Sequence, residues 1–483
     1  MATGGNGPGT LGAGVAVLLV AAMPQASRAQ APVPAANPGA PPASTQSEPG
    51  FMTNLWTRNN LFGDLGGLRS ALGKFGISLS LQTSDEILGN VSGGVKRGAS
   101  GDGLTTLDVQ LDTQKAFGWE GGTFNASVLW IYGPNFSQGY LDNLQTASGI
   151  AASPTVRLWE VWYQQAFLDG RADVKLGQQS VDQEFMVSTY SSLFLNTVMG
   201  WPMVPSADLY AGGPAYPLSS LGVRLRDHPT NAVTVLGGVF QDNPPGGPFD
   251  DDSQLRGSTR WGGNFNLRTG ALIIGEIQYA LNQPAVGQMT SANQPSGLPG
   301  TYKLGFWYDT ALFPDQRFDS AGLSLANPAS NGVARMHRGN FSFYAVADQA
   351  VWQPDAQGPR SLGVFARLMG APADRNLVSF SVDAGLNLKD PLPGRDSDSF
   401  GVGFGVAKVS GVASGLDGDT GFFTGTAYPV RGSETFIEVT YQYQIAPWWQ
   451  VQPDFQYVFM PSGGVPDPVD PGRRIGNEAV FGL

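Results

Sequence analysis

The sequence predicts an all-β protein, a transmembrane antiparallel β-barrel of about 16 strands with a short N-terminal helix. Three observations lead to this class. The 483 residues include 66 Gly and 35 Pro, and both residue types are costly inside helices. Only 14% of the residues are charged while 11% are aromatic, which is unusual for a surface that faces only water. After residue 77, apolar and polar residues alternate along most of the chain, as half-buried strands require.

The N-terminal region has the pattern of an exported protein. An apolar run, Leu11–Met23, is followed by the small-residue site Ser27–Ala29, which predicts a signal peptide over residues 1–29. The segment before the run carries no Lys or Arg, which departs from the usual pattern; the alternative is a flexible tail. Residues 30–60 are rich in Pro and Ala and predict an extended linker.

A short helix is predicted over residues 61–76, before the first strand. Leucines at 61, 65, 68 and 72 follow helical spacing, although three glycines lie among them. This element either lies against the periplasmic mouth of the barrel or forms a loosely ordered surface segment. The barrel domain is then predicted over residues 77–483.

The barrel strands are predicted from a period of two. In the stretch VSFSVDAGLNLK, every second residue from Val378 to Leu388 is apolar, and the residues between them are polar or small. Segments of this length with one polar face suit strands that cross a bilayer. The predicted strands are 77–88, 104–117, 122–132, 156–167, 171–178, 219–227, 231–241, 259–269, 272–281, 302–311, 341–353, 360–370, 377–389, 399–409, 434–446 and 448–460, with a fragment at 478–483.

A soluble β-sandwich would also alternate, so further features must decide. Aromatic residues recur at strand ends, for example Trp448 and Trp449, as in the interfacial girdles of a barrel. Many connections are either very short or long, and no helical segment is predicted between strands. This regularity breaks around residues 282–340, so we expect one strand boundary there to be wrong. The C-terminal strand looks cut short, because the chain ends AVFGL without a terminal aromatic residue.

Composition and charge exclude several function classes. The net charge of −11 gives no positive field for nucleic acid. With no Cys and two His, neither a metal site nor a bound cofactor is expected. After the N-terminal region, no apolar stretch is long enough for a membrane-spanning helix. The alternative of an outer-membrane barrel hydrolase is disfavoured by two features: neither His228 nor His337 lies beside a nucleophile motif, and no G-x-S-x-G pattern occurs.

Four segments resemble the carbohydrate-selective outer-membrane porins of the OprB family. They are RLWEVWYQQAFLDGRADVKLGQQSVDQEF (157–185), TYKLGFWYDTALFPD (301–315), FSFYAVADQAVWQP (341–354) and residues 434–464. The resemblance implies a 16-stranded barrel in the outer membrane of a Gram-negative bacterium. It implies passive diffusion of sugars such as glucose through a central constriction lined by charged and aromatic side chains. A general diffusion porin without sugar preference is the alternative. Expected partners are mono- or small oligosaccharides and outer-membrane lipid, and the chain is expected to be a monomer or a homotrimer.

A sugar pathway needs hydrogen-bonding groups and a flat aromatic surface, and alternation indicates which side chains face it. If Val161 and Tyr163 face lipid, then the neighbouring residues 160, 162 and 164 face the lumen. The alternative places Trp162 in an interfacial girdle and leaves Glu160 merely solvated. The residues assigned to the lumen are Glu160, Trp162, Gln164, Lys175, Arg224, Arg226, Arg367, Asp108, Asp383 and Glu438.

The charged members of this set suggest facing rows of opposite sign. Such rows either create a transverse field that sorts polar solutes or simply pair and keep the lumen hydrated. Arg157 has the outward parity of its strand and is assigned to the membrane interface. The apolar loop between Gln179 and Ser219 is expected either to fold inward and narrow the channel or to pack across the barrel rim.

Overall fold

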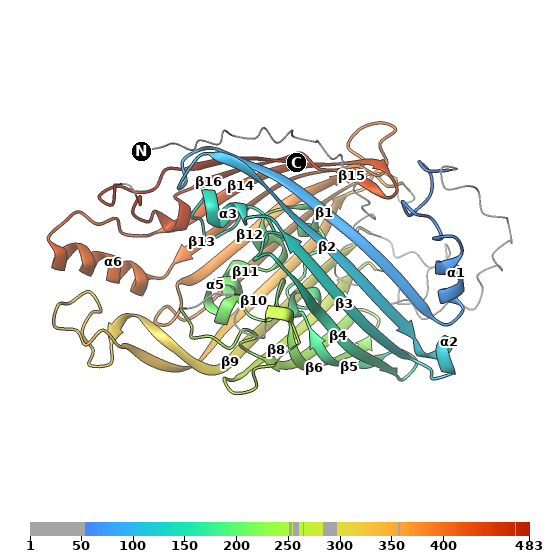
Figure 1. Ribbon diagram of the computed structural model, residues 1–483, viewed down its shortest axis with the longest axis horizontal. Helices are drawn as coiled ribbons and strands as arrows, with labels where there is room; N and C mark the ends of the chain where they lie inside the picture. Colours follow the sequence, from blue (N-terminus) through green and yellow to red (C-terminus); the bar gives the residue numbers. More distant parts are fainter. Residues whose placement is uncertain are drawn as a thin grey trace, which may run out of the picture.

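The computed structural model describes residues 54–250, 254, 260–263, 265–283, 297–355, 358–468 and 470–483. The predicted signal peptide and most of the predicted linker lie outside these residues. Within them, nearly all regular structure is strand, arranged as one closed sheet (Figure 1). No helix among the described residues is long and apolar enough to span a membrane.

The strands follow one another around the barrel in chain order. β15 and β16 both pair with β14 and form two parts of one interrupted strand, so the ring has 16 strands. The strands are β1 (Ile77–Ser92), β2 (Gly98–Asp112), β3 (Gly122–Tyr132), β4 (Thr155–Phe167), β5 (Ala172–Gln179), β6 (Ser220–Thr230), β7 (Val233–Gln241), β8 (Ala271–Leu281), β9 (Gly300–Asp319), β10 (Ala334–Trp352), β11 (Ser361–Gly370), β12 (Val378–Lys389), β13 (Ser399–Val409), β14 (Ser433–Ala446), β15 (Trp449–Val451), β16 (Asp454–Phe459) and β17 (Glu478–Gly482).

All neighbouring strands are antiparallel, and the ring closes between β17 and β1. β17 pairs with β16 on one side and with β1 on the other, where Leu88 stands opposite Gly482. A closed ring leaves no long row of unpaired backbone groups in lipid, which is the condition for a sheet to span a bilayer. The fragment predicted at 478–483 is thus the sixteenth strand.

Short helices occupy the connections at both ends of the barrel and within it. α1 and α2 lie at one end, and α6 lies at the other, where the connections are longer (Figure 1). By the usual asymmetry of bacterial barrels, the α6 end faces outward and the α1 end faces the periplasm. The helices are α1 (Leu68–Gly73), α2 (Thr113–Phe117), α3 (Phe136–Tyr140), η1 (Val181–Gln183), η2 (Ser191–Leu193), α4 (Thr197–Gly200), α5 (Met203–Asp208), η3 (Tyr210–Gly212), α6 (Gly411–Thr424) and η5 (Pro461–Gly463).

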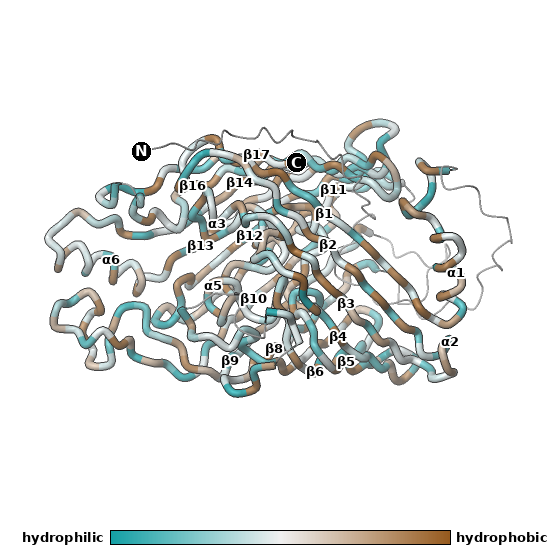
Figure 2. The backbone as a smooth tube through the Cα atoms, in the orientation of Figure 1, coloured by the Kyte–Doolittle hydropathy of each residue, from teal (hydrophilic) through white to brown (hydrophobic). Residues whose placement is uncertain are grey.

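The two faces of the wall have opposite character. Hydrophobic and hydrophilic residues alternate along β1 to β4 (Figure 2). On β9, Leu304 and Phe306 point outward and are exposed, whereas Lys303 and Trp307 are buried on the inner side. The outer face is therefore suited to lipid, and the inner face carries the polar and aromatic groups.

Several predicted bounds are wrong. Around residues 282–340, where an error is expected, β9 continues to Asp319 and β10 begins at Ala334, beyond the predicted 302–311 and 341–353. The strand predicted at 259–269 is absent from the described part of that segment, where Arg260 and Trp261 form a 3-10 turn and Gly262 adopts a positive φ of 72°. The strand predicted at 104–117 ends at Asp112, whose carboxylate accepts hydrogen bonds from the first amides of α2. The predicted N-terminal helix is shorter and covers Leu68–Gly73, because the glycines before it take left-handed conformations.

Candidate functional site

The connection between β5 and β6, residues 180–219, folds into the barrel; we call it the constriction loop. It contains η1, η2, α4, α5 and η3. Its apolar side chains, among them Val198 and Met199, belong to one buried cluster with inward residues of the opposite wall, such as Trp307 and Phe436. Because the loop buries its apolar surface against the inner wall, it fills part of the lumen rather than lying over the rim.

Inward-facing carboxylates of the wall hold this loop by its backbone amides. Glu438 accepts hydrogen bonds from Leu195 N (2.6 Å) and Asn196 N (3.2 Å). Asp348 accepts from Thr189 N at 3.0 Å. Glu276 does the same for Met186 N at 2.8 Å. Charge-assisted bonds of this kind are stronger than neutral ones, so they fix the loop position.

Arg367 holds the same loop by its carbonyl groups. Its Nη1 donates to Met186 O (3.2 Å) and Gly200 O (3.0 Å), and its Nη2 donates to Val198 O. Its Nε donates to Asp383 Oδ2 at 2.7 Å. Arg367 and Asp383 are both buried, so this pair serves the loop and presents no free group to the lumen.

The connection between β3 and β4 also enters the barrel. Glu434 accepts from Leu144 N (2.8 Å) and Gln145 N (2.7 Å), and Gln456 Nε2 donates to Ala147 O at 2.8 Å. The two inward connections touch, because the amide of Thr197 donates to Thr146 O at 3.0 Å. The two connections therefore occupy the lumen in contact with each other.

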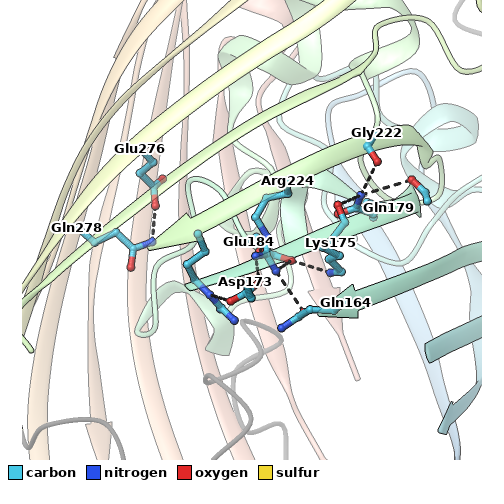
Figure 3. A network of polar contacts seen from close by, with 12 residues as sticks. Gln164, Asp173, Lys175, Gln179, Glu184, Gly222, Arg224, Glu276 and Gln278 are labelled. Carbon is cyan, nitrogen blue, oxygen red and sulfur yellow. Dashed lines mark hydrogen bonds and ion pairs between the residues drawn. The ribbon is translucent and has the colours of Figure 1, made fainter. Parts of the chain in front are cut away.

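A network of charges joins the constriction loop to β4, β5 and β6 (Figure 3). Lys175 Nζ lies 2.6 Å from Glu184 Oε1, and Glu184 belongs to the loop. Arg224 pairs with both Glu184 and Asp173, and Arg226 Nε lies 2.7 Å from Asp173 Oδ2. Three cations thus share two carboxylates.

Three inward residues of β4 also belong to this region. The ammonium group of Lys175 lies 4.2 Å from the centre of the Trp162 ring, a cation–π contact. Glu160 accepts a hydrogen bond from Ser180 N at 2.9 Å, at the start of the constriction loop. Gln164 Oε1 accepts from Arg224 Nη2 at 3.3 Å.

Burial divides the ten residues that the sequence assigns to the lumen. All ten lie on the inward parity of their strands, and seven are buried beneath or beside the inward loops: Glu160, Trp162, Lys175, Arg224, Arg367, Asp383 and Glu438. Three are partly exposed: Gln164, Arg226 and Asp108. The parity argument places the side chains, but it does not reveal that a loop covers most of them.

A cavity of about 440 Å³ remains between the constriction loop and the wall formed by β1, β14 and β15. None of the ten assigned residues lines it. Its aromatic walls include Trp159, Trp201 and Tyr216, and the rings of Trp159 and Tyr216 meet edge to face at 6.2 Å. Its polar lining includes Gln82, Gln442, Gln450 and Gln452, which carry side-chain amides.

The aromatic walls are fixed by hydrogen bonds to the backbone. Trp159 Nε1 donates to Leu218 O (3.2 Å), and Trp201 Nε1 donates to Gly212 O (2.8 Å). The Tyr216 hydroxyl donates to Ile150 O at 2.7 Å. The ring faces are therefore preorganised, and the amide groups around them can donate to or accept from a hydroxylated solute.

Comparison with known proteins decides the family. Residues 96–483 match the family described as "Carbohydrate-selective porin, OprB family". The chain belongs to this family. This OprB-family porin is a channel of the Gram-negative outer membrane and not an enzyme, and it carries carbohydrates.

Curated and solved relatives agree with that assignment. The porin is 27% identical to Porin B of Pseudomonas aeruginosa over 423 residues, which covers 83% of this chain and 87% of that protein. It is 23% identical to the "Putative porin QuiX" of Acinetobacter baylyi, covering 85% and 91%. The high-pH structure of Pseudomonas putida OprB is similar with a TM-score of 0.76 at 24% identity, covering 89% of this chain and 98% of that one.

Proposed function

We propose that this porin admits glucose-like monosaccharides and small oligosaccharides through the cavity beside the constriction loop. The observation that carries the proposal is the pairing of fixed aromatic faces, such as Trp159 and Trp201, with a set of side-chain amides around one cavity. Sugar rings offer apolar faces and hydroxyl edges, and this lining matches both. Binding of this kind is weak at each contact, as conduction requires.

The residues first assigned to the lumen take two roles in this proposal. Gln164, Arg226 and Asp108 are partly exposed toward the periplasmic half of the lumen and contact solute there. The seven buried residues hold the constriction loop or the inner wall and act on solute through the shape of the cavity. Each chain contains its own pathway, so the proposal is the same for a monomer and for a homotrimer.

Osmotic swelling of proteoliposomes tests the proposal. Glucose and xylose should enter faster than disaccharides, by more than their difference in size predicts. A Trp159→Ala variant should lose most of that preference, because it removes an aromatic wall of the cavity. Trp130→Ala is the matched control, since Trp130 points outward and is exposed.

Two outcomes contradict the proposal. Entry rates that depend on solute size alone would identify a general diffusion porin. An unchanged sugar preference in Trp159→Ala would remove the cavity from the pathway. A Trp162→Ala variant separates the two aromatic candidates, because Trp162 is buried against Lys175 and should affect loop position more than sugar contact.

A further inference from the structure

A β-bulge turns Arg157 into the barrel. Ala126 of β3 pairs with Val161 of β4, but Val128 pairs with Leu158, so two residues of β4 stand opposite Ser127. The extra residue shifts the alternation of β4, as bulges do. Arg157 and Trp159 therefore face inward, and the assignment of Arg157 to the membrane interface is wrong.

The guanidinium group of Arg157 is buried without compensation. The residue is 3% exposed, and neither Nε nor Nη1 has a hydrogen-bond partner. Among the described residues no carboxylate forms an ion pair with it, and its electrostatic neighbour is the phenol of Tyr216. Its strand partner on β3 is the buried apolar residue Leu129. A buried charge without a counter-charge disfavours folding, so such a group calls for an explanation.

The surroundings of Arg157 connect it to the solute cavity. Trp159, two positions along the inner face of the same strand, lines the cavity. Tyr216 and Ile150 line it too, and the Tyr216 phenol is the electrostatic neighbour of Arg157, which does not itself line the cavity. A solute group that displaces the Tyr216 ring would reach the guanidinium group, which carries five N–H donors.

We propose that Arg157 is the binding group for a solute carboxylate, so that the pathway also accepts sugar acids such as aldonates and uronates. This inference rests on the proposed function of the cavity. Hydroxyl groups of a neutral sugar would accept hydrogen bonds from Arg157 but would leave its charge unbalanced. A carboxylate accepts the hydrogen bonds and also balances the charge, because its two oxygens match the guanidinium fork.

The other charges around the cavity orient such a solute. Asp85 and Glu86 border the cavity from β1, and Asp182 borders it from η1. Asp182 accepts hydrogen bonds from Ser180 Oγ and Tyr216 N. The two carboxylates of β1 repel the acidic end of a solute and favour the β4 side, where Arg157 lies. Asp182, which is hydrogen-bonded to Tyr216, meets the hydroxyl groups of the solute.

Block of the single-channel current by gluconate and by glucose tests the inference. Arg157→Met keeps the length of the side chain and removes its charge. The half-blocking concentration of gluconate should rise about tenfold or more, because a charge-assisted pair is lost, while that of glucose should stay within about twofold. Arg157→Lys should recover part of the gluconate effect. Arg171→Met, at an exposed periplasmic turn, is the matched control.

Thermal unfolding provides a second measurement. If Arg157 had a structural role, its replacement would lower the unfolding midpoint, whereas a solute-binding role predicts an increase. Because Arg157 is buried and unpaired, Arg157→Met should raise the unfolding midpoint of the porin in detergent. Unchanged gluconate block, equal losses for gluconate and glucose, or a lowered midpoint with unchanged block would each overturn the inference. Failure of the proposed function gives a different result from failure of this inference. In that case glucose would neither block the current nor enter preferentially in the unaltered protein.

Discussion

At the residue scale, Arg367 is the side chain on which the constriction loop depends most. It joins Asp383 to three loop carbonyls while fully buried. Arg367→Met leaves Asp383 buried without a partner and releases the loop. We expect a loss of about 3–5 kcal/mol in unfolding free energy, measured by urea titration, and a larger single-channel conductance.

Two variants make this prediction specific. Asp383→Asn combined with Arg367→Met should recover part of the lost stability, because the uncompensated carboxylate is gone. Arg171→Met is the control; this residue pairs with Asp227 at an exposed turn, where an ion pair contributes at most about 1 kcal/mol. Equal losses for Arg171→Met and Arg367→Met would contradict the special role of Arg367.

Residue-level prediction from sequence succeeded on parity and failed where the strand is irregular. Arg224, Arg367 and Glu438 all face inward, as alternation indicates. Arg157 faces inward as well, although alternation from Val161 placed it outward, because the bulge opposite Ser127 adds one residue. The signal in the sequence was a charged Arg157 on a face assigned to lipid, which is costly and therefore improbable.

At the element scale, α6 and the long hairpin of β9 and β10 form a projection at the outer end of the barrel. Arg317 of β9 forms a bidentate pair with Asp419 of α6, with contacts of 2.7 and 2.9 Å. The hydrogen bonds from Arg317 lower the pKa of Asp419 below its usual range, and its partial burial opposes this. The pair thus stabilises the docking of α6 in the ionised state of Asp419.

The sign of the resulting pH dependence follows from that lowered pKa. The contribution of the pair is complete above the ordinary pKa of a carboxyl group and is lost as pH falls through the lowered value of Asp419. α6 should therefore loosen only in strongly acidic buffer. The chain has no Cys, so a spin label at Phe422→Cys, an exposed position of α6, reports this motion.

Asp419→Asn supplies the control for that titration. The label should be mobile at all pH values in this variant, because the charge is absent throughout. If the acid transition persists unchanged in Asp419→Asn, another group causes the motion. If the unaltered protein shows no transition, the Arg317–Asp419 pair does not hold α6 in place.

Elements were predictable where one face of a strand is regularly apolar. β3 and β13 begin and end at the predicted residues, 122–132 and 399–409. The strand at 259–269 was wrong because turn-forming glycines interrupt its alternation, and α6 was missed because its sequence GVASGLDGDTGFFT has few helix-forming residues. The inward course of the constriction loop depends on contacts with strands far away in the chain, which no local pattern contains.

At the scale of the whole molecule, the central claim is that the outer face meets lipid while the inner face meets water. Leu304 of β9 is 64% exposed and stands opposite Ile277, near the middle of β8. Gln278, the next residue of β8, has the opposite parity, and its side-chain amide donates a hydrogen bond to Glu276 on the inner side. Leu304 and Gln278 therefore lie at the same depth in the membrane, one on the lipid face and the other on the lumen face.

Arginine at each position measures the difference between those solvents. Leu304→Arg should lower the unfolding free energy in lipid vesicles by about 2–4 kcal/mol, the cost of a cation on the lipid face near the bilayer centre. Gln278→Arg should cost much less, because its charge lies in the lumen beside Glu276. Repeating both titrations in detergent micelles should reduce the penalty of Leu304→Arg, since a thin and deformable micelle lets the guanidinium reach water. Equal penalties at the two positions in vesicles would mean that the two faces do not differ in solvent, and a transmembrane barrel could not then be maintained.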